Sequence, residues 1–215
     1  MVTVAAVVRY LHSSNGSDGS QSEAAARVGE PARGVEWRDR LEREISVHVV
    51  NSSSTSYSLE SQRLFEKMDR EIALAPSWGQ LEARRLIEYV DAVPFEASLV
   101  PQAGEASEPE LTSKRDVARR AITVIGQRFS IGAPIEREAQ DQIIHMLIRY
   151  THHPESNTRF LAMNALMQST AILERPDVLA RVRKMRRNDP EHRIVRAIRQ
   201  REHRLQVDHG WEGSL

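Results

Sequence analysis

The sequence predicts an all-α protein, and three observations lead to that fold class. Apolar residues recur at steps of three and four through most of residues 35–205, which is the period of an amphipathic helix. Short intervals with proline, glycine or cap-forming side chains separate these periodic segments, as loops between packed helices do. The chain of 215 residues is also long enough to bury one core, or two small ones.

Residues 1–34 are expected to form a flexible N-terminal segment. Residues 12–34 are rich in Ser, Gly and Ala, and they contain one isolated valine and no hydrophobic period. Such a stretch cannot bury enough apolar surface to offset the entropy that it loses on ordering. The strand-like run from Val2 to Val8 precedes it, and this run either pairs with another segment or frays.

Residues 35–93 are predicted to form a small helical region of three helices. The first carries apolar residues at helical spacing, namely Trp37, Leu41 and Ile45. Its end is open, because Val47 to Val50 could instead be a strand edge. The second helix ends before Pro76 and carries Leu59, Leu64, Phe65, Met68, Ile72 and Ala75. The third is capped by Ser77 and carries Leu81, Leu86, Ile87 and Val90.

Residues 94–112 are predicted to be an acidic linker. They contain three prolines, four glutamates and no basic residue. Because proline restricts its own backbone and that of the preceding residue, a continuous helix is not expected here. Phe95 and Leu99 could still dock on a neighbouring helix.

Residues 113–205 are predicted to form an array of five helices, followed by a tail at 206–215. The helices are expected from Ser113 to Phe129, from Ile135 to His152, from Asn157 or Thr158 to Leu173, from Pro176 to Met185, and from Asp189-Pro190 to Leu205. Pro176 stands where a proline opens a helix. Helices of about 12–18 residues with short loops between them are typical of an all-α array.

The faces of two of these helices differ. The helix 135–152 is apolar on one broad side, and its other side carries Glu138, Asp141, His145, Arg149 and His152. The helix 158–173 is apolar nearly all round, which predicts that it is buried between neighbours. An exposed helix next to an enclosed one is the pattern of stacked antiparallel helix pairs.

The starts of three helices resemble one another. They read DVARRAITVIG over residues 116–126, TRFLAMNAL over 158–166 after Pro154, and DPEHRIVRAI over 189–198. Matching Ile125, Leu166 and Ile198 gives spacings of 41 and 32 residues. This looks like the HEAT or armadillo-type α-solenoid, whose second helices often begin with Asp-Pro, followed by Val-Arg and then Ala and Leu. The resemblance implies a short solenoid that binds protein, as most such repeats do, or nucleic acid, and it implies no chemistry.

Charge is distributed unevenly along the chain. The formal net charge is zero, with 30 basic and 30 acidic residues. Residues 1–112 hold 11 basic and 18 acidic residues, a net charge of −7, whereas residues 113–215 hold 19 and 12, a net of +7. The neutral total therefore conceals a basic C-terminal half. The acidic half could pack against this basic end, or the basic end could bind an anionic partner.

The positive charge is densest between residues 181 and 204, where ten basic residues face three acidic ones. The candidate binding residues are Arg181, Arg183, Lys184, Arg186, Arg187, Arg193, Arg196, Arg199 and Arg204. Such a basic end could hold DNA, RNA or an acidic protein surface. The simpler interpretation is a solvated cap, because terminal repeats need a polar outer face.

Composition excludes several classes of function. The chain has no cysteine, so it cannot be a disulfide-stapled scaffold, a cysteine-ligated zinc module or a thiol enzyme. No apolar stretch approaches the roughly 20 residues that a membrane span needs, and we therefore expect a cytoplasmic protein. His145 and His152 lie seven residues apart on one helix, about 10.5 Å, which is too far to share a metal ion.

Nothing in the chain matches a catalytic motif, because it lacks a Gly-x-Ser-x-Gly elbow and a glycine-rich phosphate loop. We therefore expect no catalytic, metal or cofactor site. The leading hypothesis is a non-catalytic interaction or scaffold protein whose partner is another protein. The alternative is nucleic-acid binding through residues 181–204, and an enzyme without a recognisable motif comes third.

Overall fold

The computed structural model describes residue 43 and residues 57–100 and 109–215, which all belong to one compact unit, Ala32–Leu215. Some expectations lie outside the described residues: the flexible segment 1–34, the helix with Trp37, Leu41 and Ile45, the strand edge at 47–50, and linker residues 101–108.

The described residues form helices and contain no named strand, which confirms the all-α class. The elements are α2 (Leu59–Met68), the π-helix η3 (Asp69–Ala73), α3 (Gln80–Asp91), α4 (Pro109–Ile131), α5 (Arg137–Tyr150), α6 (Ser156–Leu166), α7 (Thr170–Leu173), α8 (Pro176–Asn188) and α9 (His192–His209).

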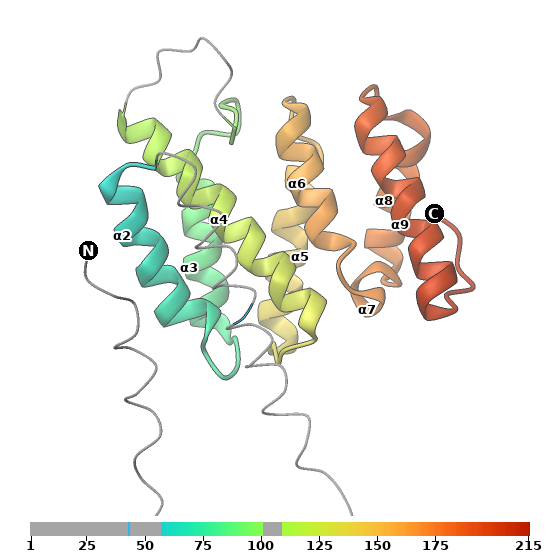
Figure 1. The fold of residues 1–215 in the computed structure, drawn as a ribbon, viewed down its shortest axis with the longest axis horizontal. Helices are drawn as coiled ribbons and strands as arrows, with labels where there is room; N and C mark the ends of the chain where they lie inside the picture. The colour runs from blue at the N-terminus through green and yellow to red at the C-terminus, as the bar shows by residue number, and fades with distance from the viewer. Residues whose placement is uncertain (1–42, 44–56, 101–108) are drawn as a thin grey trace, which may run out of the picture. The chain divides into compact units, whose positions relative to one another are not determined.

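Consecutive helices pack as pairs, and the pairs meet side by side (Figure 1). The helix α3 packs on α4, α5 on α6, and α8 on α9. Between pairs, α3 contacts α5 and α5 contacts α8, while α4 contacts α6. The helix α2 packs on α4 at the other end. First helices thus meet first helices, and α4 and α6, which are second helices, meet each other.

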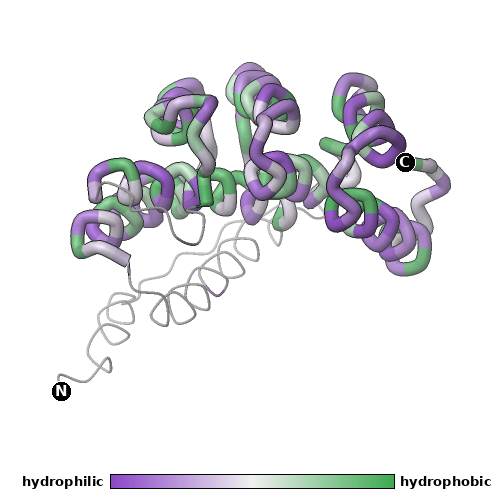
Figure 2. Tube along the Cα trace, turned by 90° about the horizontal axis from the view of Figure 1, so that it is seen from above, coloured by the Kyte–Doolittle hydropathy of each residue, from purple (hydrophilic) through white to green (hydrophobic). Residues whose placement is uncertain are grey.

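A single core runs through these contacts. Fully buried residues from four different helices contribute to it, including Leu86, Ile125, Leu147 and Leu166. Figure 2 shows apolar and polar stretches alternating along each helix, as amphipathic helices require. By contrast, Leu59 and Leu81, which the periodicity places on apolar faces, are 65% and 55% exposed.

The helix α4 lies against α2, η3, α3 and α6. It begins at Pro109, so the prediction that Ser113 caps it is wrong. Ser113 is buried within the helix, and its hydroxyl lies 3.0 Å from that of Ser58. Pro109 fits a first helical turn because that turn needs no N–H from it. The ion pair of Glu110 with Lys114, one turn later, extends the helix into the predicted linker.

The turn before α3 sets α3 beside α5. The N–H of Trp78 donates to the carbonyl of Pro134, and the N–H of Glu136 donates to the carbonyl of Trp78. The cap of α3 is Gly79, whose N–H donates to the Glu82 carboxylate at 2.9 Å, so the prediction of Ser77 as the cap is wrong. Trp78 itself is fully buried.

The predicted helix 158–173 is two helices, α6 and α7. The backbone leaves the helical path at Met167, and the carbonyls of Met167 and Gln168 accept hydrogen bonds from Arg201 of α9. A side chain thus satisfies the carbonyls that a continuing helix would have paired. The cap of α6 is the Glu155 carboxylate, which accepts from the N–H groups of Asn157 and Thr158.

Residues 94–100 dock on the α5–α6 pair, which confirms the expected docking of Phe95 and Leu99. Leu99 is 1% exposed, and its N–H donates to the Thr158 hydroxyl at 3.2 Å. Phe95 packs on the rings of Tyr150 and His153, with centroids at 5.5 and 4.7 Å. This part of the predicted linker is therefore packed against the core.

The buried His153 makes stability depend on pH. Its ring stacks on Tyr150, and its Nδ1 accepts the N–H of Glu155 at 3.0 Å. Burial lowers the pKa of His153, although the nearby Glu155 carboxylate partly opposes the shift. The unfolded chain therefore takes up a proton at a higher pH than the folded one, and stability falls as pH drops below about 6.5.

We expect the urea midpoint of the wild-type protein to fall between pH 7.5 and pH 5. The variant His153→Asn should be less stable at pH 7.5 but should lose part of this pH dependence, since it has no group that titrates at this position. Urea titrations at both pH values give, for each protein, the change in the urea midpoint between pH 7.5 and pH 5. An equal change in the two proteins would show that His153 does not carry the effect.

Candidate binding surface on helices α8 and α9

The last helix pair has well-defined ends. Pro176 opens α8 at its first position, as the sequence predicts. The Glu191 carboxylate caps α9 by accepting the N–H of Arg193, so Asp189-Pro190 precedes the helix and does not start it. Gly210 ends α9 with a φ of 61°, a left-handed conformation that glycine adopts without strain. Buried residues hold the pair together: Val178, Val182, Met185, Ile194, Ile198 and Leu205.

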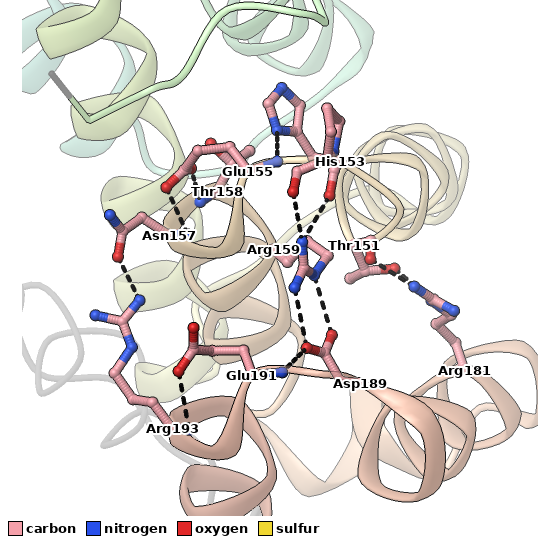
Figure 3. A network of polar contacts seen from close by, with 11 residues as sticks. Thr151, His153, Glu155, Asn157, Thr158, Arg159, Arg181, Asp189, Glu191 and Arg193 are labelled. Atoms are coloured by element: carbon pink, nitrogen blue, oxygen red, sulfur yellow. Dashed lines mark hydrogen bonds and ion pairs between the residues drawn. The ribbon is translucent and has the colours of Figure 1, made fainter. Parts of the chain in front are cut away.

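Arginines join this pair to the α5–α6 pair (Figure 3). Arg159 of α6 donates from Nε and Nη2 to the two oxygens of Asp189, both at 3.0 Å. Arg181 of α8 donates to the hydroxyl and the carbonyl of Thr151. The joint is therefore built from charge-assisted hydrogen bonds, which are stronger than neutral ones.

The helix α9 contributes two more arginines to this joint. Arg193 donates to the Asn157 side chain, and its guanidinium lies 4.9 Å from the centre of the Phe160 ring. Arg201 donates to the carbonyls at the end of α6. Sequence reasoning missed the role of Arg201, although its position between Ile198 and Leu205 on the apolar face of α9 was a signal for it.

The predicted tail 206–215 is partly helix and partly a packed segment. The helix α9 extends to His209, and the following residues fold back on α8 and α9. Trp211 is 9% exposed, and its Nε1 donates to the Glu174 carboxylate at 3.0 Å. Arg183 donates to the carbonyl of Ser214, and Arg186 donates to that of Leu215.

Gly213 lies against the Trp211 ring so closely that no side chain fits there. A Cβ atom at this position would lie 2.1 Å from Cζ2 of Trp211. We expect Gly213→Ala to displace the ring and to expose Trp211, shifting its fluorescence emission to longer wavelength. Gly132→Ala serves as a comparison, because nothing lies within 4 Å of a Cβ there and only its positive φ opposes the change. Unchanged emission in Gly213→Ala would contradict this packing.

The nine predicted binding residues fall into two groups. Five make hydrogen bonds or ion pairs within the protein that involve the side chain: Arg181, Arg183, Arg186, Arg187 and Arg193. The other four are exposed and make no side-chain hydrogen bond or ion pair with the described residues: Lys184, Arg196, Arg199 and Arg204. The structure thus divides one predicted site into a structural set and a solvent-facing set.

Two of the neighbouring carboxylates are already engaged. Asp189 binds Arg159 and also accepts the N–H of Glu191. Glu202 pairs with Arg186 at 2.9 Å and accepts the N–H of Leu215. The positive charge near the start of this pair acts on His152. Burial lowers the pKa of His152, and the charges of Arg181 and Lys184 lower it further.

A second candidate surface is a groove between α4 and α6. Its volume is about 230 Å³, and small or polar side chains line it, among them Thr123, Gln127, Asn164 and Gln168. The Oε1 atom of Gln127 is buried there without a hydrogen-bond partner. Gly126 and Ala165 allow the two helices to approach closely at this point.

Two further classes of site, a metal site and a membrane-spanning helix, are absent from the described residues. Among the described residues, no three His, Asp or Glu side chains are grouped so that they could hold a metal ion. The same residues include no helix whose length and apolar character would let it cross a membrane.

Comparisons with known proteins identify no relative. No family model matches the chain, and no curated protein or solved structure matches it significantly.

Proposed function

We propose that the protein is a non-catalytic interaction or scaffold protein, built as a short HEAT-like α-solenoid in which stacked antiparallel helix pairs present a binding surface. The observation that carries the proposal is the succession of pairs α3–α4, α5–α6 and α8–α9, with first helices against first helices. Stacked pairs of this kind create extended surfaces that bind partners without chemistry.

The groove between α4 and α6 is the surface that fits a protein partner best. It lies between two second helices, and its amide side chains offer both donors and acceptors. A cytoplasmic location stays a prediction from the sequence.

The experiment compares two surface variants of the full chain. Partners are captured by crosslinking, identified, purified and then titrated with each protein by calorimetry. Asn164→Arg places a large charged side chain in the groove, whereas Gln62→Arg makes the same change on the exposed side of α2. We expect Asn164→Arg to weaken binding of the partner at least about tenfold, while Gln62→Arg binds the partner as tightly as the wild-type protein does.

Equal affinities for both variants would place the partner elsewhere and contradict the groove. Turnover of a substrate by the folded, purified protein would contradict the non-catalytic assignment itself. Circular dichroism and thermal unfolding of each variant establish that the fold is retained.

A further inference from the structure

One side of α9 carries three arginines that form no ion pair with the described residues. Arg196, Arg199 and Arg204 are exposed on the side away from the buried residues Ile194, Ile198 and Leu205. Arg196 and Arg204 are eight residues apart, which is about 12 Å along a helix axis. We call these three arginines the α9 stripe.

The charge of the α9 stripe is not accounted for by helix capping or by ion pairs. Basic side chains in a last helical turn offset the helix dipole, and Arg186 and Arg187 of α8 have that role. Arg196 and Arg199, however, lie in the middle of α9, one and two turns after its start. Glu202 follows Arg199 by three residues, but its carboxylate is bound to Arg186. Asp208, the last carboxylate of α9, lies one turn beyond Arg204.

The composition of the stripe favours phosphate over a protein partner. Its exposed neighbours on α9 include His192, Gln200 and His203, and Val207 is the large apolar residue of that face, 67% exposed. Protein interfaces centre on aromatic or aliphatic anchors, whereas interfaces with nucleic acid are more polar and much more positive. The guanidinium group also matches phosphate with two parallel hydrogen bonds.

The same face lacks what single strands require. Stacking of bases on exposed aromatic rings supplies much of the affinity for single-stranded nucleic acid. The aromatic residue nearest in sequence to the described α9 helix is Trp211, and its ring is buried against Gly213 and Glu174. Phosphates of a duplex, by contrast, can be held by cations alone.

We propose that the α9 stripe binds the phosphate backbone of double-stranded nucleic acid without reading its bases. This goes beyond the scaffold function and uses a different surface from the α4–α6 groove. Each cation that neutralises a phosphate releases a counterion, so binding weakens steeply with salt. Three such cations correspond to a slope of about −2.7 in a plot of log K against log salt.

The test is fluorescence anisotropy with the full chain and a labelled 20-base-pair DNA duplex, a duplex RNA, a single strand and poly-glutamate, over a series of salt concentrations. The variant is Arg196→Gln/Arg199→Gln/Arg204→Gln. The matched control is Arg63→Gln/Arg70→Gln/Arg137→Gln, which removes the same charge from exposed positions on α2, η3 and α5. Thermal unfolding checks that both triple variants remain folded.

We expect the wild-type protein and the control to bind duplex with similar affinity. The α9 variant should bind it at least about 100-fold more weakly at 0.1 M salt, with a slope nearer zero. Failure of the wild-type protein to bind duplex at low salt would overturn the proposal. So would equal losses in both triple variants, tighter binding of the single strand, or binding of poly-glutamate as tight as that of duplex. None of these outcomes bears on the α4–α6 groove, so the two proposals fail separately.

Discussion

Replacing Arg128 with methionine is expected to lower the free energy of unfolding by about 3–4 kcal/mol. Arg128 is fully buried, and its guanidinium donates to the carbonyls of Ala73, Ala75, Pro76 and Pro134. It also lies 5.0 Å from the centre of the Trp78 ring. These bonds tie α4 to the turn after η3 and to the turn before α5. Methionine fills similar space but leaves the carbonyls without this donor.

Burial lowers the pKa of Arg128 to about 10, so the group is still charged at neutral pH. Its charge is compensated by the carbonyl dipoles and, at longer range, by Glu82, which opposes the shift. Arg119→Met is the matched control, because Arg119 is exposed on the same helix. We expect that control to change stability by no more than about 0.5 kcal/mol. Equal urea midpoints for the two variants would contradict the structural role of Arg128.

Replacing Arg120 with methionine is expected to cost about 3–5 kcal/mol, because it removes the buried guanidinium that binds both oxygens of the Asp69 carboxylate. The Arg120 side chain is 3% exposed and that of Asp69 is 12% exposed. Nη2 of Arg120 lies 2.6 and 2.7 Å from the two carboxylate oxygens, and Nε also donates to one of them. The pair joins the π-helix η3 to α4.

A double-mutant cycle with Asp69→Leu separates the interaction between the two charges from the packing that each side chain loses when it is replaced. The double variant Asp69→Leu/Arg120→Met removes both charges, and we expect it to be more stable than Arg120→Met alone. Urea titrations of the four proteins give the coupling energy. A coupling energy near zero would mean that the two charges do not stabilise one another in the folded protein.

The sequence predicted helices best where one face alone is apolar. The α5 and α8 helices begin and end within about three residues of the predicted positions, because a clear hydrophobic period marks each and Pro176 marks the start of α8. It predicted poorly where a distant side chain decides the outcome. Arg201 lies more than thirty residues from the carbonyls that it binds, so no local pattern could reveal that α6 ends at Leu166.

The candidate site was found as a region and not as a set of residues. Density of positive charge between 181 and 204 located α8 and α9, but it could not separate Arg181, which binds Thr151, from Arg196, which faces water. That separation depends on which acceptors lie across the joint between helix pairs. The helical position of a residue gave part of the answer, since Arg196 lies opposite the apolar face and Arg201 lies on it.

The arginine joint between the last two helix pairs also affects the order in which parts of the protein unfold. The pairs α3–α4 and α5–α6 share extended apolar contact, whereas α8 meets α5 over a short stretch and α9 reaches α6 through Arg193 and Arg201. Units with fewer buried apolar contacts open at lower free energy than the whole protein. We therefore expect the last pair to open before the rest of the protein, so that its amide protons exchange with solvent before those of α4 do.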